Sequence, residues 1–154
     1  MHSISGILRN HVVFAGLIGW FLAQALKIPI HYFVEKKWDW SRFHGSGGMP
    51  SSHTAMSVAA TIMAGALYGF DSAVFGLGAV FTSVVMYDAT GVRRETGRQA
   101  TIINTILDQV LVHGKPISDV QLKELIGHKP TEVAAGFLLG LTIAGVYILV
   151  LMNH

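Results

Sequence analysis

The chain has 154 residues, of which 51% are hydrophobic and only 13% are charged. Soluble domains carry about 25% charged residues, so this deficit argues against a soluble protein and predicts a membrane protein with a single domain over residues 1–154. The net charge of +2 does not provide the basic face that nucleic-acid binding requires, and the absence of cysteine excludes disulfides and thiolate metal sites.

Four apolar stretches, each about long enough to cross a bilayer, follow one another along the chain. We expect spanning helices at about residues 10–27, 53–70, 72–88 and 132–152. They must be helical, because backbone groups in lipid have no water partner. The first stretch has an alternative interpretation as a signal peptide, since Ala23-Gln24-Ala25 resembles a cleavage site. Its uncharged run is long for a signal core, and we favour a retained span.

Small residues recur within these stretches at a spacing of four. Gly65 and Gly69 form one such pair, and Gly136 and Gly140 form another. This pattern lets two helix backbones approach closely, so we expect these glycines to serve tight helix packing.

The basic residues predict the orientation of the four spans. All lysines and arginines except Arg9 lie in the first and third loops, which share one face of the membrane. The positive-inside rule places that face in the cytoplasm. The third loop also has apolar residues at helical spacing between Ile102 and Leu111, and Ser118-x-x-Gln121 resembles a capping box. We therefore expect an all-α integral membrane protein with four transmembrane helices plus one or two interfacial amphipathic helices in the third loop.

Polar clusters capable of chemistry occur where spans begin or end. Ser51, Ser52 and His53 open the second span, where a helix N-terminus favours anions. The alternative is an ordinary helix cap made by one of the serines. Near the fourth span, His128 and Glu132 are four residues apart and share a helix face. A carboxylate that holds one imidazole nitrogen leaves the other free to attack, whereas a capped helix start with a surface histidine is the simpler interpretation.

The end of the third span adds Asp88, Arg93 and Arg94. Paired guanidinium groups suit a phosphate, although they also anchor spans against anionic lipid. We expect Asp88 to pair with one of the arginines. Lys27 and Arg42 are further candidates for phosphate binding, while solvated loop charges are the simpler explanation for each.

Pro50-Ser51-Ser52-His53, together with His128-x-x-x-Glu132, resembles motifs of the type-2 phosphatidic acid phosphatases and the related vanadium haloperoxidases. The chain is most similar to their small divergent membrane branch, over nearly its whole length. The resemblance implies that His53 is the leaving-group acid, His128 the nucleophile and Glu132 its orienting carboxylate. By the same resemblance Ser51 and Ser52 hold phosphate oxygens, with Arg93 or Arg94 as the guanidinium clamp, and neither a metal nor another cofactor is needed.

The chain departs from the parent motifs at several positions. Ser52 replaces a glycine, Glu132 replaces an aspartate, and Phe43 follows Arg42 where the family has proline. No Ser-Arg pair lies just before His128. These departures leave open which lysine takes part and whether one chain completes a site.

The leading interpretation is a membrane phosphatase that hydrolyses a lipid-linked phosphate or diphosphate, of phosphatidate or isoprenoid type, through a histidine nucleophile. Its partners are the membrane and a lipid phosphate, with a homo-oligomer as an option and no nucleic acid. Two alternatives stay open. One is a non-catalytic membrane protein that binds anionic lipid or acts as a scaffold, and the other is a metal-assisted hydrolase using Asp88, Glu132 and a histidine.

Overall fold

The computed structural model describes residues 4–38, 40–43, 47–91, 97, 99–104 and 128–153. The elements in chain order are η1 (Ile4–Arg9), α1 (His11–Glu35), η2 (Trp40–Phe43), α2 (Ser52–Tyr68), α3 (Ala73–Thr90) and α5 (Pro130–Met152), where η denotes a 3-10 helix. Residues 99–104 are also helical. All regular structure in these residues is helical, which confirms the all-α prediction.

Three helices, α1, α3 and α5, are long and apolar enough to cross a membrane. The chain is accordingly an integral membrane protein. The remaining long helix, α2, has 17 residues, which corresponds to a rise of about 26 Å against a hydrocarbon core of about 30 Å. Four spans therefore stay a prediction, with α2 as the fourth.

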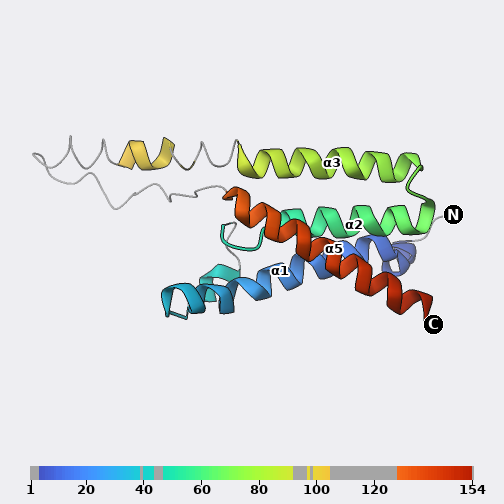
Figure 1. Ribbon diagram of the computed structural model, residues 1–154, viewed down its shortest axis with the longest axis horizontal. Helices are drawn as coiled ribbons and strands as arrows, with labels where there is room; N and C mark the ends of the chain where they lie inside the picture. The colour runs from blue at the N-terminus through green and yellow to red at the C-terminus, as the bar shows by residue number, and fades with distance from the viewer. Residues whose placement is uncertain are drawn as a thin grey trace, which may run out of the picture.

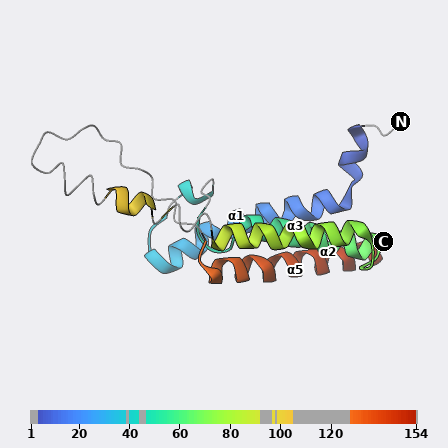
Figure 2. The same cartoon turned by 90° about the horizontal axis from the view of Figure 1, so that it is seen from above.

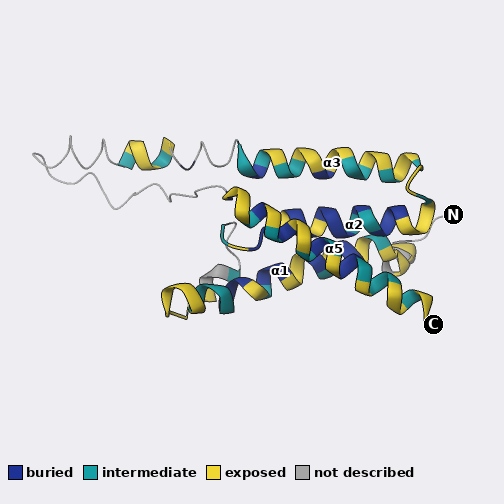
Figure 3. Cartoon of the chain, in the orientation of Figure 1, coloured by how far each residue is buried: buried dark blue, intermediate teal, exposed yellow. Residues whose placement is uncertain are grey.

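Helix α2 occupies the centre of the bundle and packs against α1, α3 and α5. Figure 2 shows the same helices from above, and Figure 3 shows that α2 is the most buried of them. Helix α3 lies at the periphery. Only 11% of its most apolar 18-residue stretch is buried inside the protein, compared with 39% for α1. Ala15, Ala59, Met63 and Ile143 form the core where α1, α2 and α5 meet.

Glycines allow α1 and α5 to approach α2 closely. A Cβ at Gly19 or at Gly140 would lie 2.8 Å from the carbonyl oxygen of Ala55, and one at Gly136 would collide with the Ser51 carbonyl. The packing expected of Gly136 and Gly140 is therefore present. At the other pair no backbones of the described helices approach each other. Gly69 lies beyond the end of α2 with φ of 96°, and Gly65 faces rings of the following turn and α3 rather than a helix backbone.

Helix α1 is longer than the apolar stretch from which it was predicted. It continues through Lys27 and Pro29 to Glu35. Lys27 is buried and interacts electrostatically with Glu132 of α5, so its charge does not end the helix. Ala23 and Gln24, in the proposed cleavage site, lie inside this helix and are buried in the bundle.

One end of the bundle collects the parts of the chain that carry polar clusters. The start of α2, the end of α3 and the start of α5 lie at this end, and both chain termini lie at the other, as Figures 1 and 2 show. The amphipathic helices predicted for the third loop fall mainly within residues 105–127, outside the described residues. Of their apolar face only Ile102 and Ile103 are described, and both are exposed.

Candidate functional site

A cavity of about 200 Å³ opens at this end of the bundle, between α2, α3 and the start of α5. Its lining residues are His53, Val84, Val85, Asp88, Ala89 and His128. Three of the six, the two histidines and Asp88, are candidates that the sequence predicted from separate clusters. The helix tips thus bring two imidazoles, which are 75 positions apart in the chain, to one small space.

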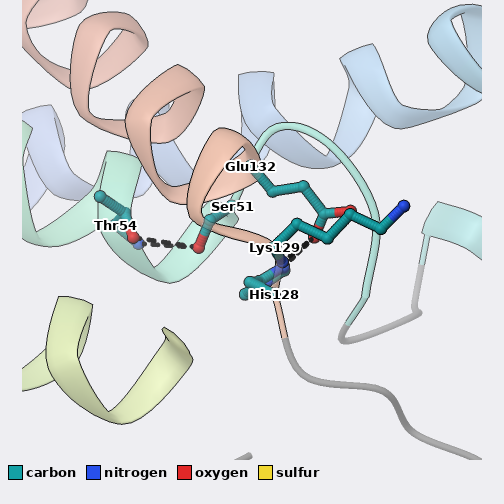
Figure 4. Close-up of polar contacts among 5 residues, drawn as sticks. All are labelled: Ser51, Thr54, His128, Lys129 and Glu132. Carbon is teal, nitrogen blue, oxygen red and sulfur yellow. Dashed lines mark hydrogen bonds and ion pairs between the residues drawn. The ribbon is translucent and has the colours of Figure 1, made fainter. Parts of the chain in front are cut away.

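His128 lies two residues before the start of α5, and a residue of the first turn of that helix binds its side chain. Its Nδ1 lies 2.9 Å from the Glu132 carboxylate, which also accepts the Lys129 backbone N–H at 3.2 Å. A carboxylate accepts hydrogen bonds, so Nδ1 carries the proton and Nε2 of the neutral ring has a lone pair. The ring is only 2% exposed, and its Nε2 is buried with no hydrogen-bond partner among the described residues. Figure 4 shows the Lys129 side chain extending away from the imidazole.

His53 and Asp88 form the opposite side of the cavity. His53 is the second residue of α2 and is exposed, whereas Asp88 is half-buried in the last turn of α3. An exposed imidazole can exchange protons with water. The cavity therefore has one buried and one exposed histidine.

The two serines are buried at the start of α2 and do not line the cavity. Ser51 caps the helix: its Oγ accepts the Thr54 N–H at 3.4 Å and the Thr54 hydroxyl at 3.0 Å, as drawn in Figure 4. The helix-cap interpretation is thus confirmed for Ser51. With both lone pairs occupied, the Ser51 hydroxyl retains only its O–H donor. Ser52 is 1% exposed.

A main-chain hydrogen bond connects the two helix starts. The Ser51 N–H donates to the Glu132 carbonyl oxygen at 2.9 Å. This bond joins the segment that carries His53 to the helix whose Glu132 holds His128. Their relative position is therefore set by the backbone, in addition to the glycine contacts below it.

Lys27 comes to the same end of the bundle from α1. It is 2% exposed, interacts electrostatically with Glu132, and its Cδ approaches Gly48 in the loop before α2. Gly48 has φ of 92°, a conformation that favours glycine, so the loop can pass over the lysine stem. Lys27 therefore lies behind the His128–Glu132 pair rather than in the cavity wall.

The remaining predicted cations are not placed as side chains. Arg93 and Arg94 lie outside the described residues, and for Arg42 the backbone position in η2 is described without its side chain. Both arginines of the pair follow closely on Thr90, the last residue of α3. That helix supplies four of the six lining residues of the cavity.

The cavity wall formed by Val84, Val85 and Ala89 was not predicted. These residues lie in an apolar stretch that also has valines outside the cavity, such as Val74 and Val80, so composition does not distinguish the two faces. A usable signal was the position of Asp88, because Val84 is four residues earlier and shares its helix face.

Within the described ranges, no three His, Asp or Glu side chains are placed to hold one metal ion. Asp88 and His128 line the cavity, while Glu132 binds the far edge of the His128 ring. Of the two carboxylates named for a metal-assisted mechanism, Asp88 is among the lining residues of the cavity and Glu132 is not.

Comparison with known proteins identifies the family of the chain. The chain is 37% identical over 147 residues to the uncharacterized membrane protein YuiD of Bacillus subtilis (strain 168), a match that covers 89% of this chain and 93% of the relative. No solved structure matches it. Residues 8–143 match the family described as the Divergent PAP2 family. With most of its length in that match and a membrane protein as a relative, the chain belongs to the Divergent PAP2 family.

Proposed function

We propose that the protein is a membrane phosphatase that removes phosphate from a lipid-linked phosphate or diphosphate, with His128 as the nucleophile. One observation carries this proposal. Glu132 holds Nδ1 of a buried imidazole in a cavity that a second histidine also lines, while Nε2 is left without a partner among the described residues. An imidazole oriented in this way is prepared for attack on phosphorus.

The reaction is a double displacement. The Nε2 lone pair of His128 forms a bond to phosphorus as the bond to the leaving oxygen breaks, and His53 gives that oxygen a proton, releasing an alcohol or a phosphate. Glu132 stabilises the positive charge that develops on the ring. Water, deprotonated by His53, then breaks the N–P bond and releases inorganic phosphate, which restores both histidines.

The dimensions of the cavity suggest which part of a substrate it holds. Pockets for whole drug-sized ligands measure about 300 to 1,000 Å³, whereas this one measures about 200 Å³. It suits a phosphoryl group and the first carbons of the leaving group. Val84, Val85 and Ala89 belong to α3, a candidate spanning helix, so the hydrocarbon chain of a lipid would continue from the cavity into the bilayer.

Charge stabilisation is assigned to the basic residues at this end. Arg93 and Arg94 follow closely in sequence on α3, the helix that forms most of the cavity wall. This position supports their role as a phosphate clamp. The N-terminus of α2, the helix that carries His53, adds a favourable electrostatic environment for an anion. Lys27 acts indirectly, through its electrostatic interaction with Glu132. The positive-inside rule assigns this end to the cytoplasm.

The test uses purified protein and a panel of phosphatidate, lysophosphatidate and isoprenyl phosphates and diphosphates. We expect phosphate release that His128→Ala abolishes and His53→Ala slows by about 10²- to 10⁴-fold, the usual contribution of general acid–base catalysis. His11→Ala is the matched control, since His11 bonds Tyr147 near the chain termini, outside the cavity. Unchanged release by His128→Ala would falsify the nucleophile assignment.

A binding protein without turnover is the second candidate. Two observations favour it: Phe43 stands where the first phosphate motif has proline, and neither Ser51 nor Ser52 lines the cavity. Saturable binding of lipid phosphates without phosphate release from any of them would decide for this candidate. Release that stops in a chelator and returns with a divalent cation would decide for the metal-assisted alternative.

A further inference from the structure

Beyond the cavity, aromatic side chains gather where α1 ends. Tyr32, Phe33, Trp38 and Trp40 are named here the aromatic strap. Tyr32 stacks on Trp38 with ring centroids 4.6 Å apart, and Trp38 lies nearly parallel to Trp40 at 6.3 Å. Phe33, Trp38 and Trp40 are 71%, 60% and 71% exposed. The rings of Trp38 and Trp40 stack on one another and are still exposed. They therefore form an apolar surface that suits a partially apolar environment.

A backbone turn at the end of α1 brings the stacked rings together. Lys36 has φ of 56°, the left-handed conformation, and its N–H bonds the Tyr32 carbonyl. This turn reverses the chain directly after Glu35, so that Trp38 returns to Tyr32. Further on, Phe43 meets Phe21 edge to face at 6.1 Å. Because Phe21 is an exposed apolar residue of a candidate spanning helix, Phe43 connects the chain that follows the strap to the lipid-facing surface of α1.

The length of α1 places the strap at a particular depth. Its 25 residues rise about 37 Å, whereas the hydrocarbon core is about 30 Å thick. If the core begins near His11, Trp20 lies about 14 Å into it and Tyr32 about 31 Å along the helix, at the opposite boundary. The strap therefore coincides with the layer in which Trp and Tyr rings are enriched.

The charges beside the strap suit the same layer. Lys36 and Lys37 are exposed, and the Lys36 ammonium lies 5.9 Å from the centroid of the Phe33 ring. Glu35 is engaged by His31 at 3.5 Å. In a layer of lipid headgroups, long basic side chains can reach the phosphates while neighbouring amphipathic rings contact the hydrocarbon beneath.

We propose that the aromatic strap lies in the headgroup layer of the bilayer and anchors α1 at a fixed depth. Its occupant is the lipid surface itself, rather than a soluble partner or a second copy of the chain. The strap precedes the loop that leads into α2, the helix that carries His53. This inference does not depend on phosphatase activity.

The three tryptophans of the chain supply the test. Protein with Trp20→Phe reports on Trp38 and Trp40, and protein with Trp38→Phe and Trp40→Phe reports on Trp20 in the middle of the same helix. Both are reconstituted in phosphatidylcholine–phosphatidylglycerol vesicles containing lipids brominated near the headgroup or near the chain end. We expect the shallow bromines to quench Trp38 and Trp40 about twofold or more better than the deep ones, with the reverse order for Trp20.

A second comparison tests the anchoring. Replacing Trp38 and Trp40 by Ala instead of Phe should shift the depth profile of Trp20, because the rings no longer hold the helix. Three results would overturn the proposal: quenching of Trp38 and Trp40 by aqueous acrylamide as efficient as for free tryptophan, lipid quenching that disappears as the protein-to-lipid ratio rises, or a Trp20 profile that is the same in the Ala and Phe proteins.

Discussion

At the scale of single residues, the properties of His128 come from its neighbours. The same ring on an open surface would share its two nitrogens between water molecules and favour neither. Here Glu132 binds one edge at 2.9 Å, the nitrogen of the other edge is buried with no hydrogen-bond partner among the described residues, and the residue lines the cavity. The chain contains a second His–Glu pair at the same spacing, His31 and Glu35, which lies outside the cavity.

Replacing Glu132 should therefore reduce catalysis with little effect on binding. For Glu132→Gln we expect kcat for the best lipid phosphate to fall about 10²- to 10⁴-fold, because the amide no longer stabilises the charged ring. The matched control is Glu35→Gln, which breaks the other His–Glu pair. Steady-state kinetics in detergent micelles measure both. Equal losses in the two variants would show that the effect is structural.

The residues of the site could be predicted to different extents. The His128–Glu132 contact followed from a spacing of four at a helix start, since i and i+4 residues share a face. The approach of His53 to His128 followed from counting spans. The wall of Val84, Val85 and Ala89 could not be predicted, because lipid and a cavity select the same apolar residues. Lys27 marked the end of the apolar stretch, yet the helix continues through it, and the buried lysine interacts electrostatically with Glu132.

At the scale of the helices, contacts between α2 and its neighbours hold the site together. Lipid is as apolar as a leucine side chain, so helices in a membrane associate through close packing and hydrogen bonds. Gly19 and Gly140 approach the Ala55 carbonyl from α1 and α5. Thr61 and Thr82 form the buried polar contact to α3, at 2.9 Å.

Adding one methyl group to α5 tests the packing. In Gly140→Ala the new Cβ would lie 2.8 Å from both the Ala55 carbonyl and the Val58 Cβ, so we expect a loss of about 1 to 3 kcal/mol in the free energy of unfolding. Gly145→Ala, on the same helix, meets nothing within 4 Å and serves as the control. Thermal unfolding in detergent, followed by circular dichroism, compares them. An unchanged Tm for Gly140→Ala would contradict the close approach.

The hydrogen bond between α2 and α3 can be measured by a double-mutant cycle. Thr61→Val and Thr82→Val should each destabilise the protein by about 0.6 to 2 kcal/mol, since either leaves a buried hydroxyl without its partner. The double variant should lose less than the sum of the two. Denaturation in mixed micelles gives the three values, and strict additivity would mean that the hydroxyls do not interact.

At the scale of the whole molecule, the arrangement of helices implies a topology. The chain termini lie at one end and the candidate site at the other, as expected for an even number of crossings. The turn between α2 and α3 contains Asp71 and lies at the end of the termini (Figure 1). Lys37 follows α1, whose C-terminal end lies at the end of the site. With α2 as a fourth span, these two residues are on opposite sides of the membrane.

Labelling of single cysteines tests this topology directly, because the native chain contains none. With a maleimide that cannot cross membranes, we expect Asp71→Cys to react in right-side-out vesicles and Lys37→Cys only in inverted ones. Both side chains are exposed, so access within the protein does not limit either reaction. If the two positions react in the same vesicles, α2 does not cross the bilayer. If Asp71→Cys reacts only in inverted vesicles and Lys37→Cys in right-side-out ones, the site faces outward.

The main-chain bond from Ser51 to Glu132 has a consequence for how this scaffold can change. Every residue has a backbone carbonyl, and every residue except proline has a backbone N–H. This hydrogen bond therefore does not depend on the side chains at the two positions. Saturation mutagenesis could therefore exchange the reactive groups around the cavity while the spacing between the two helix tips persists. At position 51, proline is the substitution that would release it.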